Sequence, residues 1–246
     1  MKIIGIIPAR YASTRFPGKP LADINGKTMI QRVYEQASKS VLDKVLVATD
    51  DERIMDHVLS FGGDAMLTAT QHQSGTDRCF EAYSHLNEHY DCVLNIQGDE
   101  PFIKPEQINT LAETFEDETV QIATLVKVIK SESELFNPNL PKVVLNNEQD
   151  AIYFSRHPIP YNRNAPMSQW HLKHTYYKHI GIYGYRPEVL EQITLLEPSG
   201  LEISESLEQL RWIENGYTIT TAVTEYESMG IDTPDDLERA MLIYTS

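Results

Sequence analysis

Short apolar runs alternate with longer amphipathic segments along this chain, and this alternation constrains its fold more than any other feature. Two of the runs, Ile3–Ile7 and Cys92–Ile96, are almost wholly apolar, which is typical of strands buried on both faces. The expected strands are Ile3–Ile7, Lys44–Ala48, Cys92–Ile96, Ile122–Val128, Lys142–Leu145, Ala151–Phe154, His179–Tyr185 and Tyr217–Val223. The expected helices are Thr28–Ser38, Asp51–Phe61, Ser74–Tyr90, Pro105–Phe115, Arg186–Leu195, Glu202–Asn215 and Pro234–Tyr244. Strands that alternate with helices predict an α/β fold with a mostly parallel central sheet and helices on both faces.

The 246 residues contain no linker, internal repeat or low-complexity tract, so we expect one domain spanning residues 1–246. The second half is less regular than the first and is interpreted as a subregion inserted into that domain. Within it, residues Tyr161–Lys173 are rich in Asn, Pro and other polar types and are expected to form a loop.

The charge balance excludes some classes of partner. Lys plus Arg is 21 and Asp plus Glu is 36, so the formal charge is −15, which argues against general binding to nucleic acid or to anionic membranes. No apolar stretch approaches the roughly 20 residues needed to span a bilayer, and Met1–Ile7 lacks the features of a signal peptide. The two cysteines, Cys79 and Cys92, are too few and too badly spaced for a zinc site, and nothing indicates an exported disulfide scaffold. We therefore expect a cytoplasmic protein with no nucleic-acid partner and no membrane insertion.

The strongest chemical signal is the segment Pro8–Pro20, which directly follows the first expected strand. It contains Arg10, Arg15 and Lys19 but no acid, and its small residues allow backbone N–H groups to approach an anion. A solvated basic loop is the alternative. The position after a buried strand, where ligands bind in parallel sheets, favours a polyphosphate site. The chain has neither a complete P-loop nor the glycine pattern of a dinucleotide-binding turn.

Two aspartates are candidate magnesium ligands. Asp99 follows a buried strand and Gly98, and a carboxylate at such a position can hold Mg²⁺ against nucleotide phosphates. A surface turn is the alternative interpretation. Asp232 lies before Pro234, where Asp232 or Thr233 could equally be a helix cap. Asp232 therefore becomes a ligand only if the fold brings it beside Asp99.

Two further patterns are open to more than one interpretation. Residues His85–His89 match the H-x-x-E-H spacing of a zinc site, although eight histidines make a chance match easy, and we do not expect zinc there. The stretch Tyr176–Tyr185 combines His, Tyr and glycines, which suits a sugar pocket but also a packed strand.

The motifs together resemble those of the 3-deoxy-manno-octulosonate (KDO) cytidylyltransferases, also called CMP-KDO synthetases. The matching blocks run in order over nearly the whole chain. They are Ile7–Leu21, Ala48–Asp50, His72–Arg78, Asn95–Pro101, Tyr153–Arg156, His179–Tyr185, Leu207–Arg211 and Gly230–Pro234. The resemblance implies one GT-A-like, Rossmann-like nucleotidyltransferase domain with an inserted β-rich dimerisation subregion. It also implies a homodimer, CTP and KDO as substrates, and a role in lipopolysaccharide biosynthesis.

The resemblance also implies roles for individual residues. The catalytic set would be Arg10, Lys19, Asp99 and Asp232, with Mg²⁺ as the cofactor on the two aspartates. The nucleotide would contact Arg10, Ser13, Arg15, Lys19 and Arg78, the last on the cytidine side. The sugar acid would contact Gln97, Arg156, His179, Tyr183, Glu208 and Gln209, with Arg156 as the partner of its carboxylate.

These residues predict in-line attack by the anomeric hydroxyl of the sugar on the α-phosphorus of CTP. Mg²⁺ would lower the pKa of that hydroxyl, and the basic loop would stabilise the pyrophosphate leaving group. Three alternatives remain open: a cytidylyltransferase for another acid sugar such as 8-amino-KDO or sialic acid, a glycosyltransferase of similar architecture, and a non-catalytic nucleotide sensor.

Overall fold

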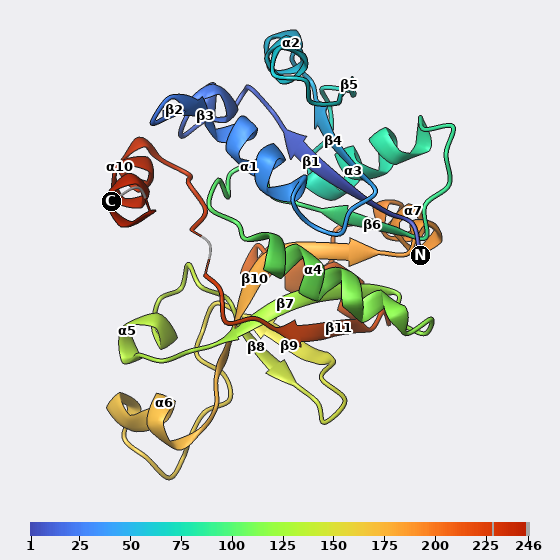
Figure 1. The fold of residues 1–246 in the computed structure, drawn as a ribbon. Helices are drawn as coiled ribbons and strands as arrows, with labels where there is room; N and C mark the ends of the chain where they lie inside the picture. The colour runs from blue at the N-terminus through green and yellow to red at the C-terminus, as the bar shows by residue number, and fades with distance from the viewer. Residues whose placement is uncertain (228, 245–246) are drawn as a thin grey trace.

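A nine-stranded sheet forms the centre of the molecule in the computed structural model, which describes residues 1–227 and 229–244 (Figure 1). Seven strands follow the order β11-β7-β10-β6-β1-β4-β5, and β8 and β9 branch from β10. The strands are β1 (Ile3–Ala9), β4 (Lys44–Thr49), β5 (Ala65–Leu67), β6 (Cys92–Asn95), β7 (Ile122–Val128), β8 (Lys142–Leu145), β9 (Ala151–Ser155), β10 (Tyr177–Tyr185) and β11 (Ile219–Val223). A separate small hairpin joins β2 (Asp23–Ile24) to β3 (Lys27–Thr28).

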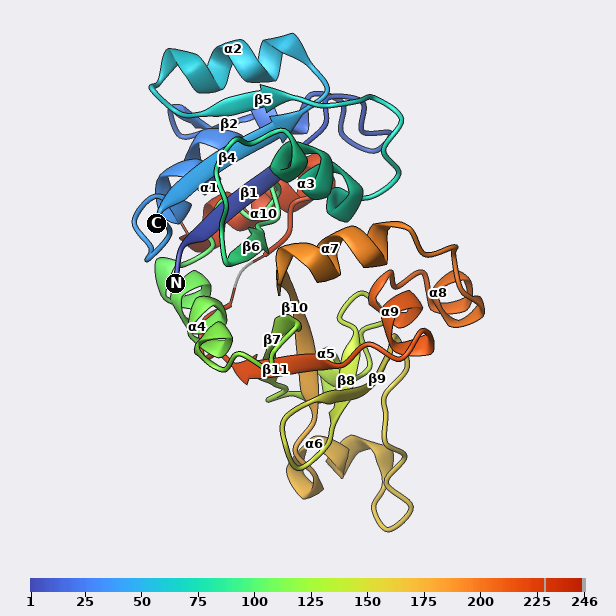
Figure 2. The same ribbon diagram turned by 90° about the vertical axis from the view of Figure 1, so that its right-hand side faces the viewer.

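The direction of the strands confirms the predicted architecture. β1 pairs in parallel with both β4 and β6, β4 with β5, and β11 with β7. The exception is β10, which runs antiparallel to β6, β7 and β8. The antiparallel pair β8–β9 forms the β-rich branch expected in the second half. Helix α6 (Trp170–Lys173) lies at the opposite end of the molecule from α2 (Glu52–Ser60) (Figures 1 and 2).

Helices cover both faces of the sheet because the side chains of β1 alternate between two separate cores. Ile3 and Ile7 pack with α1, α2 and α4, whereas Ile4 and Ile6 pack with α3, α7 and α9. The helices are α1 (Met29–Ala37), α2 (Glu52–Ser60), α3 (Gly75–Ser84), α4 (Pro105–Glu113), α5 (Glu132–Leu135), α6 (Trp170–Lys173), α7 (Pro187–Thr194), α8 (Gly200–Glu205), α9 (Gln209–Glu214) and α10 (Pro234–Tyr244). Short 3₁₀ turns occupy Lys19–Leu21, Thr114–Glu116 and Met167–Gln169.

Some predicted boundaries are wrong. The helix expected over Glu202–Asn215 is two helices, because Ser206 between them adopts a left-handed conformation with φ 52°. α3 ends at Ser84, so His85–His89 lie beyond the helix, and no group of three or more candidate metal ligands occurs among the described residues. The segment predicted as the loop Tyr161–Lys173 contains α6, anchored by the buried Trp170. The described residues include no helix long and apolar enough to cross a membrane.

A close approach between two chain segments shapes the carboxyl-terminal edge of the sheet. Gly98 follows β6, and a Cβ atom there would lie 2.7 Å from the carbonyl oxygen of Pro8 at the end of β1. That distance is too short for any residue with a side chain, so glycine allows the ends of β1 and β6 to lie against each other.

We predict that Gly98→Ala lowers the free energy of unfolding by about 1–3 kcal/mol, because the new methyl group must push the two backbones apart. Gly200→Ala is the control, since the nearest atom to its added Cβ would be 3.9 Å away. Urea unfolding of both variants measures the difference, and equal stability of the two would contradict the backbone contact.

Candidate active site

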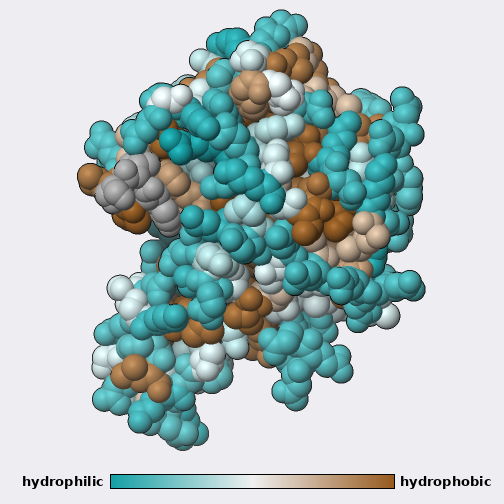
Figure 3. Space-filling model, viewed as in Figure 1, coloured by the Kyte–Doolittle hydropathy of each residue, from teal (hydrophilic) through white to brown (hydrophobic). Residues whose placement is uncertain are grey.

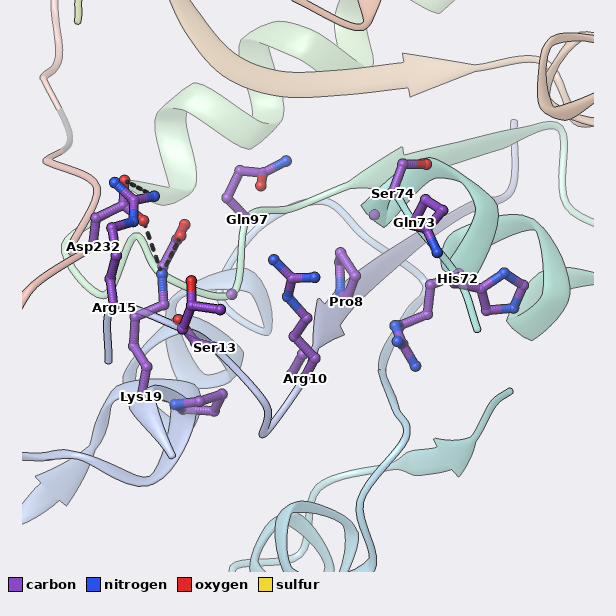
Figure 4. Close-up of a pocket in the computed structure, with 17 residues that line it drawn as sticks. Pro8, Arg10, Ser13, Arg15, Lys19, His72, Gln73, Ser74, Gln97 and Asp232 are labelled. Carbon is purple, nitrogen blue, oxygen red and sulfur yellow. Dashed lines mark hydrogen bonds and ion pairs between the residues drawn. The ribbon is translucent and has the colours of Figure 1, made fainter. Parts of the chain in front are cut away.

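A cavity of about 250 Å³ opens at the carboxyl-terminal edge of the sheet, beside the ends of β1 and β6 (Figure 4). Its lining comes from four stretches of chain that are far apart in the sequence. They are Pro8–Pro20, His72–Arg78, Gln97–Asp99 and Asp232, represented by Pro8, Ala9, Arg10, Ser13, Thr14, Arg15, Lys19, Pro20, His72, Gln73, Ser74, Gly75, Arg78, Gln97, Gly98, Asp99 and Asp232. Every residue predicted to contact the nucleotide lines this cavity.

The basic segment folds back on itself directly after β1. The backbone N–H groups of Ser13 and Gly18 both donate to the carbonyl oxygen of Tyr11, at 2.9 and 3.0 Å. Gly18 has φ +69°, and a Cβ atom added there would lie only 3.1 Å from the Tyr11 ring. The fold-back leaves Arg10 and Arg15 exposed at the cavity, whereas the side chain of Lys19 is only 13% exposed. The segment is therefore an ordered cationic wall.

The two predicted magnesium ligands, Asp99 and Asp232, lie close together, which was the condition for Asp232 to act as a ligand. The Nζ atom of Lys19 lies 2.7 Å from Oδ2 of Asp99 and 3.3 Å from Oδ1 of Asp232, and Arg15 pairs with the other oxygen of Asp232 at 3.1 Å (Figure 4). The backbone N–H of Ile231 donates to the carbonyl oxygen of Asp99 at 2.9 Å, which holds the two segments together. Two carboxylates thus surround one cation at one end of the cavity.

The sequence left open whether Asp232 or Thr233 caps the following helix, and the hydrogen bonds of the neighbouring residues answer this. Thr233 Oγ1 accepts a hydrogen bond from the backbone N–H of Asp236, and Asp236 Oδ2 accepts one from the backbone N–H of Thr233. This reciprocal pair caps α10. The carboxylate of Asp232 takes no part in the cap and instead faces Lys19 and Arg15.

Arg78 lines the cavity but is engaged in the protein. Its guanidinium is buried and donates to Asp50 Oδ2 at 2.9 Å, to Thr68 Oγ1 at 2.6 Å and to the carbonyl oxygen of Ala69 at 3.3 Å. These bonds give Arg78 a structural role, and its contact with the nucleotide stays a prediction.

The predicted sugar-binding residues are divided between the cavity and its surroundings. Gln97 lines the cavity. Tyr183 on β10 pairs with Asn95 in the sheet, two residues before Gln97. Glu208 accepts a hydrogen bond from Thr76 Oγ1 at 2.9 Å, close to Ser74 and Gly75 in the cavity wall. Gln209 is buried on α9, which begins at that residue.

Several polar atoms in this region are buried without a partner. Among the described residues, Asn95 Oδ1, Tyr183 Oη and Gln209 Nε2 have no hydrogen-bond partner. Burial also raises the pKa of the Tyr183 hydroxyl and of the Glu208 carboxyl. Unsatisfied buried polar groups are costly in a folded protein. None of these three residues lines the cavity, so their unpaired atoms belong to the packed region behind it.

Arg156 lies outside the cavity. Its Nε, Nη1 and Nη2 atoms donate to the backbone carbonyl oxygens of Glu205, Pro138 and Ser206, at 2.6, 3.1 and 3.1 Å. The guanidinium thus holds the junction between α8 and α9 to the end of β9. Its predicted contact with the carboxylate of the sugar finds no support in this arrangement.

His179 lies in a neighbouring cavity with Glu100, Lys178 and Gly181. Its ring packs against Phe154 and Tyr183, and its Nε2 atom lies 3.0 Å from Thr124 Oγ1. Burial lowers the pKa of His179 to about 3, so the imidazole is neutral in the folded protein near neutral pH. A neutral ring at this position can contact a sugar hydroxyl but carries no charge toward a phosphate.

The cavity also contains residues that the motif reasoning did not single out. His72, Gln73 and Ser74 form the wall opposite Asp99 and Asp232 (Figure 4). The signal that could have found them is their place in the same sequence block as Arg78. Ser74 also caps α3 by accepting from the backbone N–H of Asp77 at 3.1 Å, which ties this wall to the helix.

Comparison with known proteins agrees with this geometry. A family model described as cytidylyltransferase matches residues 4–220. A 3-deoxy-manno-octulosonate cytidylyltransferase from Parabacteroides distasonis is 62% identical over 98% of this chain and 97% of its own length. One from Cytophaga hutchinsonii is 60% identical over 97% and 96%. The chain belongs to the 3-deoxy-manno-octulosonate cytidylyltransferase family.

A solved structure of the family has the same fold. A CMP:2-keto-3-deoxy-manno-octonic acid synthetase, solved in complex with CTP, superposes with a TM-score of 0.92 at 45% identity and covers 100% of this chain and 99% of its own. The cavity of this cytidylyltransferase family member therefore lies in a scaffold that, in a relative, was solved with CTP.

We predict a pH dependence of stability that comes from His179. The folded state holds the ring neutral, with a pKa of about 3 against 6.5 in the unfolded chain, so below pH 6.5 only the unfolded chain takes up this proton. Stability therefore falls as the pH falls. Between pH 6.5 and about pH 5, the wild type should lose about 1.5–2 kcal/mol more unfolding free energy than His179→Gln, measured by urea unfolding. Parallel pH profiles would contradict the buried neutral ring.

Proposed function

We propose that this protein joins CTP and 3-deoxy-D-manno-octulosonate into CMP-KDO and pyrophosphate, a reaction that supplies activated sugar for lipopolysaccharide biosynthesis. The observation that carries the proposal is the convergence of Asp99 and Asp232 at one end of a cavity whose wall is the basic segment after β1. The family membership and the CTP complex of a relative support the choice of nucleotide and sugar.

The basic segment would bind the triphosphate. Arg10 and Arg15 are exposed at the cavity, and Arg15 and Lys19 already contact carboxylates there. Guanidinium and ammonium groups form charge-assisted hydrogen bonds with phosphate oxygens. In the reaction, these cations would offset the charge that develops on pyrophosphate as the bond between the α- and β-phosphates breaks.

The carboxylates fit a magnesium ion. Asp99 and Asp232 already share one cation, the ammonium of Lys19. Magnesium takes oxygen ligands and is commonly held by one or two carboxylates together with substrate phosphates, which suits a site with two carboxylates. Once bound, Mg²⁺ would stabilise negative charge between the attacking sugar hydroxyl and the α-phosphate.

The sugar acid would lie between Gln97 and the start of α9. Gln97 lines the cavity. Tyr183 and Glu208 lie next to its wall, through the pairing of Tyr183 with Asn95 and the hydrogen bond from Thr76 to Glu208, and Gln209 follows Glu208. There they would orient the anomeric hydroxyl for attack on the α-phosphorus. The new bond joins the anomeric oxygen to that phosphorus, while pyrophosphate and the hydroxyl proton are released.

The assembly and location of the enzyme are further parts of the proposal. We propose a homodimer that uses the β8–β9 branch and the neighbouring α6 region, which exposes the large apolar side chains of Ile152, Tyr161 and Leu172. On the face seen in Figure 3, this end of the molecule is mostly hydrophilic with a small hydrophobic cluster. Sedimentation equilibrium tests this assembly. A cytoplasmic location is supported by Cys79 and Cys92, which are both free and buried.

The test of the reaction is pyrophosphate release from CTP, Mg²⁺ and KDO. Release with CTP but not with ATP, GTP or UTP would support the choice of base. A panel containing 8-amino-KDO and sialic acid separates KDO from other acid sugars. A glycosyltransferase would release no pyrophosphate, and a nucleotide sensor would bind CTP without turnover.

We predict that Asp99→Asn and Asp232→Asn each lower kcat by about 100-fold or more, because each removes a negative ligand for the metal from the transition state. Asp235→Asn is the control, since it makes the same change on α10 at an exposed residue outside the cavity and should stay near wild-type kcat. Full activity of Asp232→Asn would show that the Asp232 carboxylate has only a local structural role.

We predict that Lys19→Met raises the KM for CTP by about ten-fold, the cost of one charge-assisted hydrogen bond. Without CTP, the variant should gain more thermal stability from Mg²⁺ than the wild type does, because its two carboxylates lose their shared ammonium. Differential scanning calorimetry with and without Mg²⁺ measures this gain. An equal gain in both proteins would show that Lys19 does not neutralise the pair.

A further inference from the structure

The wall of the cavity opposite the aspartates is a loop, residues 69–74, that is held at both ends by α3. At its far end, Ser74 caps the helix. At its start, both oxygens of the Glu81 carboxylate accept from the backbone N–H of Ala69 at 3.0 Å. On the other side of the same residue, Arg78 donates to the carbonyl oxygen of Ala69 at 3.3 Å. Two side chains one turn apart on α3 thus grip one residue of the loop.

Glu81 makes a third contact with the loop. Its Oε2 atom hydrogen-bonds Nε2 of His72, a residue that lines the cavity. A single carboxylate therefore sets both the start of the loop and the position of His72. Burial acts to raise the pKa of Glu81, but the hydrogen bonds from His72 and Ala69 bring it below its usual value, so the group is charged near neutral pH.

The position of the loop in the cavity suits contact with the nucleoside part of a bound nucleotide. Arg15 and Lys19 gather with Asp232 at one end of the cavity, and His72, Gln73 and Ser74 form the other end (Figure 4). A triphosphate that lies along the cations leaves this second end for the base and ribose. Glu81 does not line the cavity, so it acts on a nucleotide only through the loop.

We propose that Glu81 is a positioning residue that sets base selectivity, by holding the 69–74 loop at the spacing that a cytosine fits. The proposal rests on the proposed function and deepens it. Selectivity between bases of the same size depends on a few polar contacts at fixed positions, and a loop free to move would accept either base. Holding the loop before the nucleotide arrives also lowers the ordering cost of binding.

The test compares Glu81→Ala and Glu81→Gln with the control Glu52→Gln, an exposed glutamate at the start of α2. Steady-state kinetics with CTP, UTP and KDO give kcat and KM for each substrate. Glu81→Ala should raise the KM for CTP about ten-fold and lower the CTP-to-UTP ratio of kcat/KM about ten-fold, the cost of charge-assisted hydrogen bonds. The KM for KDO should stay near the wild-type value.

Glu81→Gln keeps one oxygen that can accept from Ala69 and should recover part of both losses. If Glu81→Ala does not fold, Glu81→Gln alone tests the proposal. Calorimetric titration of Glu81→Gln with CTP and with UTP then measures how far the ratio of the two affinities falls below the wild-type ratio. A variant that loses thermal stability but keeps the wild-type CTP-to-UTP ratio would overturn the proposal. So would an equal loss for CTP and KDO.

Failure of the proposed function would look different. In that case the wild type would show no turnover of CTP with KDO. A wild type that turns over CTP and KDO while both Glu81 variants keep its base selectivity would overturn only the role of Glu81.

Discussion

The contact of one ammonium group with two carboxylates organises the site. Lys19 comes from the segment after β1, Asp99 from the segment after β6, and Asp232 from the chain that leads into α10. Two carboxylates at this separation repel each other unless a cation lies between them. The ion pairs therefore bring three distant segments together, and they place two carboxylates at one end of the cavity, where we propose the magnesium site.

The second organising element is α3, whose side chains hold two segments that lie far apart in the sequence. Arg78 and Glu81 hold Ala69, and Thr76 holds Glu208. The helix thereby fixes the 69–74 loop of the cavity wall on one side and the start of α9 on the other. A packed helix is a more precise support for such side chains than a loop would be.

Much of the fold could be predicted because buried strands and amphipathic helices have periodic patterns. The failures occur where tertiary contacts outweigh local preference. The expected helix Glu202–Asn215 is interrupted at Ser206, whose carbonyl oxygen accepts from Arg156. Arg156 shows a related limit, because the sequence of a motif block does not reveal whether its arginine binds a carboxylate or, as in this structure, three backbone carbonyl oxygens. Its contact with the sugar stays a prediction.

The sequence by itself determined the alternation of strands and helices, the cationic segment after β1, and the two acids Asp99, after a strand, and Asp232, before a helix. It could do so because these are local patterns of charge and hydropathy. Only the tertiary structure decided that Asp232 faces Lys19 while Thr233 caps α10, since both residues suit a cap equally well. It also decided which side chains share the cavity, because proximity across more than a hundred residues depends on how the whole sheet packs.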